Sequence, residues 1–503
     1  MKYLEKIMNQ CKTALLLIIL IISTTVFSCG NNHNDGLRYG FTTEPTTLDP
    51  LSPSNTADGR SILFNVFEGL VKPNVNGTFI PCIAESWTIE QGGLVYNFKL
   101  RDGVYFHDDS IVTPADVKFS LDTAIAAGFS NLINIDEVII KEDNHISIVL
   151  KKADPAFIPY LTVGIVKAGN NNREIDTIGT GPFKIKSFTP QRNLVIEKFD
   201  NYWQSELPHL DKVTFVFFSN YDTLMAALRG GGIDGAFITG SMAAQLDHTK
   251  FDIFNNHSAA VQLLAFNNSA FPLNDLRVRQ AINYAIDVQG IIDTAFFGVG
   301  VPSGSPIIPG LSVFYENTLS YSYNPELALN LLSQAGFNNT NRLTLEITVP
   351  SNFTMHVDTA QVIVSQLEKI GINASIKLVD WSTWLEDVYF GRRYQSTIIS
   401  LDSPSVSARS FLTRYRSNDG NNFMNFNNPD FDRVYDAVLT EQDSSRRIRL
   451  YKDAQRIIAE NAAGVFIQDI LYFIAFRGGA YSGTLDYPLY VIDFSSIYGI
   501  KNN

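Results

Sequence analysis

Residues 81–122 read PCIAESWTIEQGGLVYNFKLRDGVYFHDDSIVTPADVKFSLD, and this stretch decides the predicted fold. A short run over 86–90 ends at a Gln-Gly-Gly turn, and a second run over 94–101 alternates Leu, Tyr, Phe and Leu with Val, Asn, Lys and Arg. Two such runs joined by a glycine turn are typical of a β-hairpin with one buried face. The sequence Thr-Pro-Ala-Asp then predicts the start of a helix, with Thr113 as N-cap and Asp116 reaching back to it.

The same stretch resembles the signature region of the family 5 extracellular solute-binding proteins, which serve peptide, nickel and related ABC importers. The family pattern runs P-x-[LI]-A-x-[SG]-W, continues with Y-x-F-x-L-R-x-G-V-x-F-H-D-G, and ends at A-x-D-V. Asp109 stands where the family has Gly, and Asp tolerates the left-handed backbone that such a turn requires. We therefore interpret the His-Asp-Asp sequence at this turn as structural. The matching positions are Ala84, Glu85, Ser86, Trp87, Phe98, Leu100, Arg101, Gly103, Val104, Phe106, His107 and Asp108.

Further segments extend the resemblance over residues 37–480. The Glu-Pro…Leu-Asp-Pro spacing of 44–50 resembles the family's first loop, at the edge of its ligand cleft, and 62–71 resembles its first helix. Residues 178–183 (IGTGPF) resemble the GTGP[FY] landmark, where we expect the glycines to allow close backbone packing. Residues 274–281 resemble the family's N-D-x-R-V-R-Q-A helix.

The second half of the chain alternates strand and helix patterns, which predicts an α/β fold. The resemblance implies two lobes around a hinge, with the ligand cleft between them and an extra subdomain inserted near the N-terminus, as in periplasmic binding proteins. By analogy, lobe I comprises 37–60, 178–266 and 470–503, the inserted subdomain comprises 61–177, and lobe II comprises 267–469.

Length and composition favour a large soluble binding protein. At 503 residues the chain exceeds what one hydrophobic core usually organises. Its 45% apolar and 18% charged residues are ordinary for a globular protein. The formal net charge of −12 becomes −14 without residues 1–28, because 36 basic and 50 acidic residues remain. An acidic chain without basic clusters is a poor candidate for binding nucleic acid, so no nucleic-acid partner is predicted.

The N-terminus predicts export and a lipid anchor. Three lysines precede an apolar run over 14–22, which is too short to span a membrane as a helix. Val-Phe-Ser-Cys over 26–29 resembles a loose lipobox, which implies removal of residues 1–28 as a lipoprotein signal peptide and lipidation of Cys29. Residues 29–36 then form a flexible polar tether. An ordinary secretory signal cleaved nearby, or an uncleaved anchor, is the alternative.

No pattern points to catalysis, to a metal or to a cofactor. The seven histidines are scattered without the spacing of a metal site, and no nucleophile elbow or dinucleotide loop follows a strand. Once Cys11 is removed and Cys29 is lipidated, Cys82 is the one remaining thiol, so no disulfide is expected. Cys82 is predicted to be a small buried side chain. We therefore predict a binding protein and not an enzyme.

The resemblance also implies which residues contact a ligand. In family members that take peptides, a carboxylate on lobe II precedes an aromatic-led helix and holds the ligand's amino terminus. The comparable segment here is 400–415, where Asp402 is the only acid but is displaced by a couple of residues from the family position. Arg409 stands where acidic or amide residues are common, which permits an anionic or uncharged ligand. Aromatic side chains can flank a ligand, although they fill cores more often. The remaining candidates are Thr43 and Glu44 on the first loop, and Trp381 and Trp384 on lobe II.

These patterns predict the substrate-binding component of an ABC importer. We expect a lipid-anchored monomer at the periplasmic or extracytoplasmic face of the membrane, which captures di- or oligopeptides between its lobes and delivers them to permease subunits. Nickel chelates, haem, sugars and opines are alternative ligands. A ligand-sensing partner protein that does not transport is the alternative of another class, and a surface hydrolase is a third.

Overall fold

The computed structural model describes residues 36–74, 76–316, 321–402, 407–483 and 491–499. The predicted signal peptide, Cys29 and nearly all of the predicted tether lie outside the described residues. The chain forms two units, Met1–Gly36 and Leu37–Asn503, and the second is described here by itself. We keep the names lobe I, inserted subdomain and lobe II for the predicted segments, whose boundaries stay a prediction.

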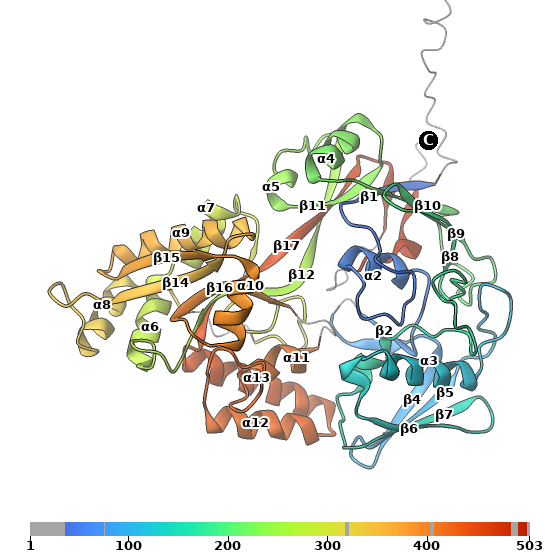
Figure 1. Ribbon diagram of the computed structural model, residues 1–503, viewed down its shortest axis with the longest axis horizontal. Coiled ribbons are helices and arrows are strands. Elements are labelled where there is room, and N and C mark those ends of the chain that lie inside the picture. The colour runs from blue at the N-terminus through green and yellow to red at the C-terminus, as the bar shows by residue number, and fades with distance from the viewer. Residues whose placement is uncertain (1–35, 75, 317–320, 403–406, 484–490, 500–503) are drawn as a thin grey trace, which may run out of the picture. The chain divides into compact units, whose positions relative to one another are not determined.

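One mixed sheet joins both lobes (Figure 1). Its strands are β1 Leu37–Phe41, β8 Phe183–Thr189, β9 Asn193–Lys198, β10 Lys212–Phe217, β11 Gly235–Ile238, β12 Phe251–Phe266, β13 Val301–Pro302, β14 Thr344–Pro350, β15 Asn373–Val379, β16 Ser396–Asp402 and β17 Gly464–Arg477. They follow the order β15-β14-β16-β12-β17-β11-β1-β10-β9-β8, and β13 pairs with β17.

The strands β12 and β17 are longer than their neighbours because each crosses from one half of the sheet to the other. The β12 residues that follow Phe251 pair with the end of β17 that also contacts β11, whereas residues 260–266 pair with β16. The pairing register between β12 and β17 shifts between His257 and Val261. Figure 1 shows these two strands running between the elements of lobe I and those of lobe II.

In lobe II, helices cover both faces of the sheet, because successive side chains of a strand point to opposite faces. Leu264 and Phe266 of β12 face one layer of helices, and Leu263 and Ala265 face the other. The first layer contains α6 Leu276–Ala285, α7 Val288–Ala295, α8 Pro325–Gln334 and α9 Thr354–Glu368. The second contains the π-helical turn Trp384–Phe390, α11 Ala408–Leu412, α12 Pro429–Thr440 and α13 Ser444–Glu460.

The signature stretch forms a small antiparallel sheet of its own within the inserted subdomain. The strands β4 Ala84–Glu90, β5 Val95–Leu100, β6 Ile135–Ile140 and β7 His145–Leu150 follow the order β4-β5-β7-β6. The predicted hairpin is confirmed, since β4 and β5 pair across a turn of three residues with positive φ. The predicted helix start is confirmed as well. In α3 (Pro114–Ala126), the backbone N–H and hydroxyl of Thr113 donate to Asp116 at 2.8 and 2.6 Å.

The predicted helix over 62–71 is wrong in its bounds. Helix α2 spans Ala57–Phe64, and β2 (Val71–Pro73) begins where the predicted helix would end. The intervening carbonyls are used by other parts of the chain, because Asn65 and Val66 accept from the N–H groups of Phe183 and Gly181 at 3.1 and 2.9 Å. Tertiary hydrogen bonds therefore replace those that a longer helix would make.

The glycines of the GTGP landmark lie against this same segment, as predicted. A Cβ at Gly181 would lie 2.6 Å from the Asn65 carbonyl oxygen. The His-Asp-Asp turn of the signature stretch contacts the landmark from the other side. There His107 Nδ1 accepts from the Gly179 N–H at 3.2 Å, and Nε2 donates to the Gly181 carbonyl at 3.0 Å. The structural role predicted for His107 is confirmed.

Candidate functional site

Two sets of parallel strands end toward the middle of β12 and β17, which we call the crossover strands. β14 pairs in parallel with β15 and β16, and β1 pairs in parallel with β10 and β11. β16 runs antiparallel to β12, and its last residue, Asp402, lies opposite Ala260. β11 runs antiparallel to β17, and its last residue, Ile238, lies opposite Phe473, which in turn pairs with Asn255 of β12. The carboxyl ends of the two sets therefore approach the same stretch of β12 from opposite directions.

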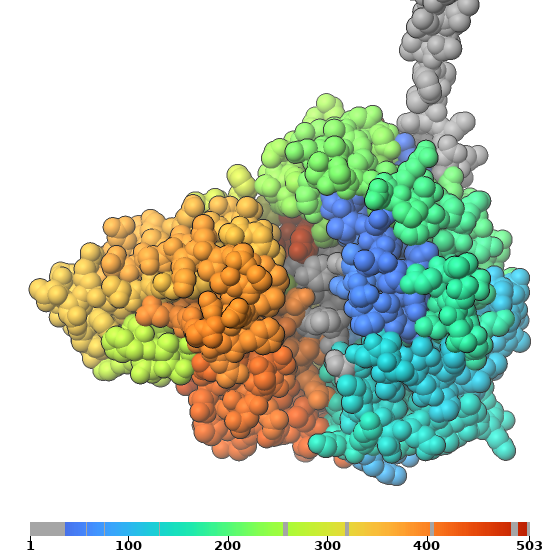
Figure 2. Space-filling view, viewed as in Figure 1, coloured from blue at the N-terminus to red at the C-terminus, as the bar shows by residue number. Residues whose placement is uncertain are grey.

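A hollow lies between these two sets of strand ends. Figure 2 shows it between the blue elements around α2 and the orange elements around α10 (Trp381–Thr383), which follows β15. In open α/β sheets, ligands bind outside the carboxyl ends of the strands, where loops can supply side chains without disturbing the sheet. We therefore treat this interlobe cleft as the candidate binding site.

On the lobe I side, Thr43 and Glu44 follow β1 directly. The N–H and hydroxyl of the exposed Thr43 donate to Asp58 at 3.1 and 2.5 Å. Burial raises the pKa of Asp58 above its ordinary value, and the hydrogen bonds from Thr43 oppose that shift. Glu44 accepts from the Gln191 N–H at 2.6 Å, so one of its carboxylate oxygens fixes the β8–β9 turn. Thr43 and Asp58 together form a polar edge on this side of the cleft.

On the lobe II side, the two predicted tryptophans stack on each other. Their ring centroids lie 5.0 Å apart and their planes differ by 5°. Trp384 is 2% exposed and donates its indole N–H to Thr397 at 2.9 Å, so it belongs to the core. Trp381 is 40% exposed, and the ring of Phe353 meets it edge-on at 5.5 Å. Of the pair, Trp381 is the one whose ring surface remains open to a ligand.

Asp402 and Arg409 lie at the ends of different elements and have separate partners. Asp402, at the exposed end of β16, lies 3.9 Å from Arg414. One guanidinium nitrogen of Arg414, Nη1, is buried without a hydrogen-bond partner within the described residues. Arg409, in α11, forms an ion pair with Asp154 of the inserted subdomain. Its charge is therefore already matched by a protein carboxylate.

A buried polar network lies on the crossover strands beside the cleft. Gln468 of β17 donates to Gln262 of β12 at 2.8 Å, and Gln262 donates to His356 Nδ1 at 3.1 Å and to Thr359 at 3.0 Å. Burial lowers the pKa of His356 to about 4, so the ring is neutral at physiological pH. Because these groups bond to one another, the network fixes α9 against β12.

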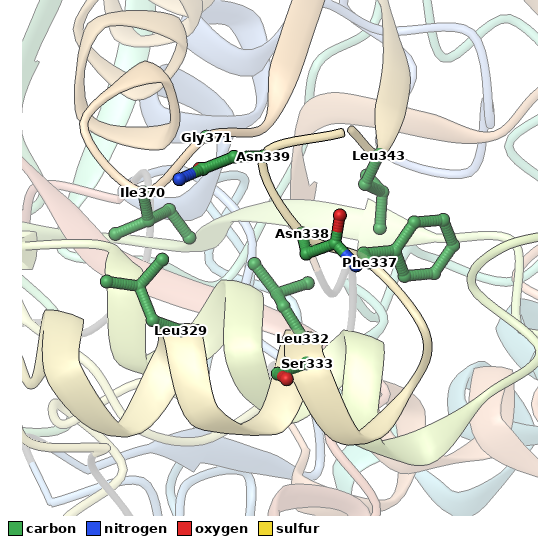
Figure 3. Close-up of a pocket in the computed structure, with 9 residues that line it drawn as sticks. All are labelled: Leu329, Leu332, Ser333, Phe337, Asn338, Asn339, Leu343, Ile370 and Gly371. Carbon is green, nitrogen blue, oxygen red and sulfur yellow. The ribbon is translucent and has the colours of Figure 1, made fainter. Parts of the chain in front are cut away.

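Two cavities lie away from the predicted site residues. The first, of about 190 Å³, lies on lobe II, where Leu329 and Leu332 of α8 point toward Ile370 (Figure 3). The second, of about 30 Å³, lies beside Glu68 and Cys82. Cys82 is buried as predicted, and burial raises the pKa of its thiol. Across the described ranges no cluster of His, Cys, Asp and Glu could hold a metal ion, and no helix is long and apolar enough to cross a membrane.

Sequence reasoning missed several residues at the strand ends. Phe353 follows β14 as Trp381 follows β15, so the alternating strand pattern before it could have indicated its place at the same edge. The positions of Asp58, Arg414 and Asp154 depend on contacts between distant segments. No local pattern could have revealed those contacts.

Comparison with known proteins agrees with this geometry. The family model described as bacterial extracellular solute-binding proteins, family 5 middle, matches residues 78–423. A heme-binding protein A of Haemophilus influenzae is 27% identical over 442 residues, covering 79% of this chain and 80% of that protein. A dipeptide-binding protein of Escherichia coli is 24% identical over 511 residues, covering 91% and 92% of the two chains.

Solved structures show the same fold. The periplasmic murein tripeptide binding protein MppA, in its unliganded open form, superposes with a TM-score of 0.84 at 22% identity, covering 93% of this chain and 97% of that one. This likeness concerns the fold alone. It confirms the predicted fold class, the α/β fold of two-lobed periplasmic binding proteins.

Proposed function

We propose, from the premise that this chain belongs to family 5 of the bacterial extracellular solute-binding proteins, that it captures peptides in its interlobe cleft and delivers them to the permease of an ABC importer. The observation that carries the proposal is the convergence of two sets of strand carboxyl ends on one stretch of β12. A ligand in the cleft would contact both lobes at once. Closure would follow because those contacts form only in the closed state.

The side chains at the cleft suit a ligand with both polar and apolar groups. Thr43 and Asp58 offer a hydroxyl and a carboxylate on one side, whereas Trp381 and Phe353 offer ring surfaces on the other. A short peptide carries an amino group that a carboxylate can hold and side chains that can stack on aromatic rings. The dipeptide and murein tripeptide named for two similar proteins are ligands of this chemistry.

A thermal-shift screen with di-, tri- and oligopeptides tests the proposal. A ligand that binds only the folded state stabilises it by about 2.7 kcal/mol at 100 times its Kd, so the melting temperature should rise with peptide concentration. Unchanged melting temperatures for every peptide would contradict the proposal. Haem and nickel chelates belong in the same screen. A response to either of them alone would favour that alternative ligand.

We also propose that Cys29 anchors the protein to the outer face of the membrane. The family is extracytoplasmic, and the sequence before Cys29 resembles a lipobox. On cell fractionation, the wild-type chain should then be found in the membrane pellet. The Cys29→Ser variant should be found in the soluble fraction or should keep its signal peptide. Equal membrane association of both would contradict lipidation. Genes for a permease and an ATPase beside this one would favour transport over a sensing role.

A further inference from the structure

Lobe II contacts the inserted subdomain at a place separate from the crossover strands. The β4–β5 turn approaches the segment between α12 and α13 so closely that a Cβ at Gly92 would lie 3.1 Å from the side-chain nitrogen of Gln442. Nearby, Arg409 of α11 reaches Asp154, which follows β7. The inserted subdomain and the helices α11 to α13 of lobe II are thus in contact. This contact connects them apart from the crossover strands.

The ion pair at this contact is largely shielded from solvent, and its carboxylate is held in place by the inserted subdomain. The side chain of Asp154 is 8% exposed and that of Arg409 is 24% exposed. The second carboxylate oxygen of Asp154 accepts from the Ala156 N–H at 3.1 Å, and its backbone carbonyl accepts from the hydroxyl of Tyr96. Among the described residues, this is the one ion pair that joins 61–177 to 267–469.

Aromatic side chains from both partners surround the pair. Tyr160 belongs to the inserted subdomain, whereas Tyr435 and Tyr451 belong to α12 and α13, and the charge of Arg409 acts on all three hydroxyls. Tyr451 is 3% exposed and Tyr435 is 2% exposed. Because these rings exclude water, the attraction between the two charges is stronger than that of a surface pair.

The contact lies at one end of the interlobe cleft. Figure 2 shows the red-orange helices of lobe II meeting the cyan inserted subdomain below the hollow. In Figure 1 the same place is occupied by α11 and α13, next to the inserted elements. The cleft is therefore bordered by β12 and β17 at one end, and lobe II meets the inserted subdomain at the other. The Arg409–Asp154 ion pair joins these same two parts of the chain.

We propose that Arg409 and Asp154 form a tie between lobe II and the inserted subdomain that closes this end of the cleft and limits the ligand to compact molecules. The size limit rests on the proposed peptide-binding function, whereas the tie itself does not. A long extended peptide would have to leave the cleft past the ion pair, which its binding would break. Shorter peptides would stay between the two ends and leave the ion pair intact.

Two measurements on the purified protein test the tie and its consequence separately. Hydrogen exchange without ligand reports the tie: in Arg409→Ala and in Asp154→Asn, amides of 156–162 and 408–415 should exchange at least tenfold faster than in the wild type. Calorimetry with alanine peptides of two, three, five and eight residues reports the size limit. The wild type should bind the two shorter peptides at least tenfold more tightly than the octapeptide, and each variant should lose this preference.

Two further variants serve as controls. The exchanged pair Asp154→Arg with Arg409→Asp should restore part of the wild-type protection at 408–415, because the attraction is kept while the bond from the Ala156 N–H to residue 154 is lost. Arg38→Ala breaks an ion pair with Asp234, whose side chains are 41% and 15% exposed, and that pair lies within lobe I at the amino end of β1. It should leave both measurements unchanged.

Each unfavourable outcome has a distinct meaning. Exchange rates unchanged in both single variants would overturn the tie. An unchanged length preference in variants with faster exchange would overturn the size limit. If no peptide binds to any variant, the proposed ligand class fails, and the exchange data alone decide whether the tie exists.

Discussion

At the scale of single residues, His107 shows how a partly buried ring couples stability to pH. Burial lowers its pKa to about 4, and its Nδ1 accepts from the Gly179 N–H, so protonation would remove that hydrogen bond. In the unfolded chain the pKa is about 6.5. Between these values the unfolded chain binds a proton at His107 that the folded chain does not. The contribution of His107 to stability is therefore fully present above pH 6.5 and is lost as the pH decreases toward 4.

We predict that His107→Gln removes part of this pH dependence. Lowering the pH from 7.5 to 5.5 costs the wild type about 1.3 kcal/mol through this one residue, and the variant should lose less stability by that amount. Urea unfolding at the two pH values measures the difference. Because the comparison is between two proteins at the same pH, all other titrating groups cancel. Equal losses in both would show that His107 is not shielded as described.

A second residue-scale prediction concerns the GTGP landmark. Gly181→Ala places a Cβ 2.6 Å from the Asn65 carbonyl oxygen, a backbone atom that cannot rotate away. We expect a loss of about 1–3 kcal/mol of unfolding free energy, as for other overpacked sites. Gly420→Ala is the matched control, because a Cβ there meets nothing within 4 Å and the residue has no positive φ. A control as destabilised as Gly181→Ala would refute the steric explanation.

At the scale of elements, the two stacked tryptophans should separate binding from stability. Trp384→Ala removes a core side chain and should cost about 3–5 kcal/mol of stability. Trp381→Ala removes a ring that is 40% exposed and should cost less stability than Trp384→Ala, while peptide affinity falls about tenfold if the ring stacks on the ligand. Calorimetry and thermal unfolding of both variants check this. Undiminished affinity in Trp381→Ala would remove this residue from the site.

The same scale shows what the sequence could predict. The hairpin and the start of α3 follow from local chemistry, a glycine turn and the bonds between Thr113 and Asp116, and both are confirmed. The end of α2 was mispredicted because Gly181 and Phe183, more than a hundred residues later, donate to carbonyls that a longer helix would use. The partner of Arg409 was hidden for the same reason. Local patterns contain no information on which distant segment will be adjacent.

At the scale of the whole body Leu37–Asn503, the crossover strands and the Arg409–Asp154 contact connect its parts in physically different ways. The crossover strands join them through continuous backbone and ladder hydrogen bonds, and the pairing register shifts between His257 and Val261. The Arg409–Asp154 contact is made of side chains alone, so it can open and reform. Motion of the lobes should therefore bend the first connection and strain the second.

This difference leads to a last prediction about ligand-driven closure. A peptide that raises the melting temperature should also reduce the radius of gyration measured by small-angle X-ray scattering, because its contacts to both lobes favour the closed state. At saturating peptide, Trp381→Ala should reach the same radius as the wild type but at a higher concentration, since the substitution weakens binding without altering the crossover strands. A ligand that stabilises the protein without reducing its radius would bind outside the cleft, and the strand-end site would then be wrong.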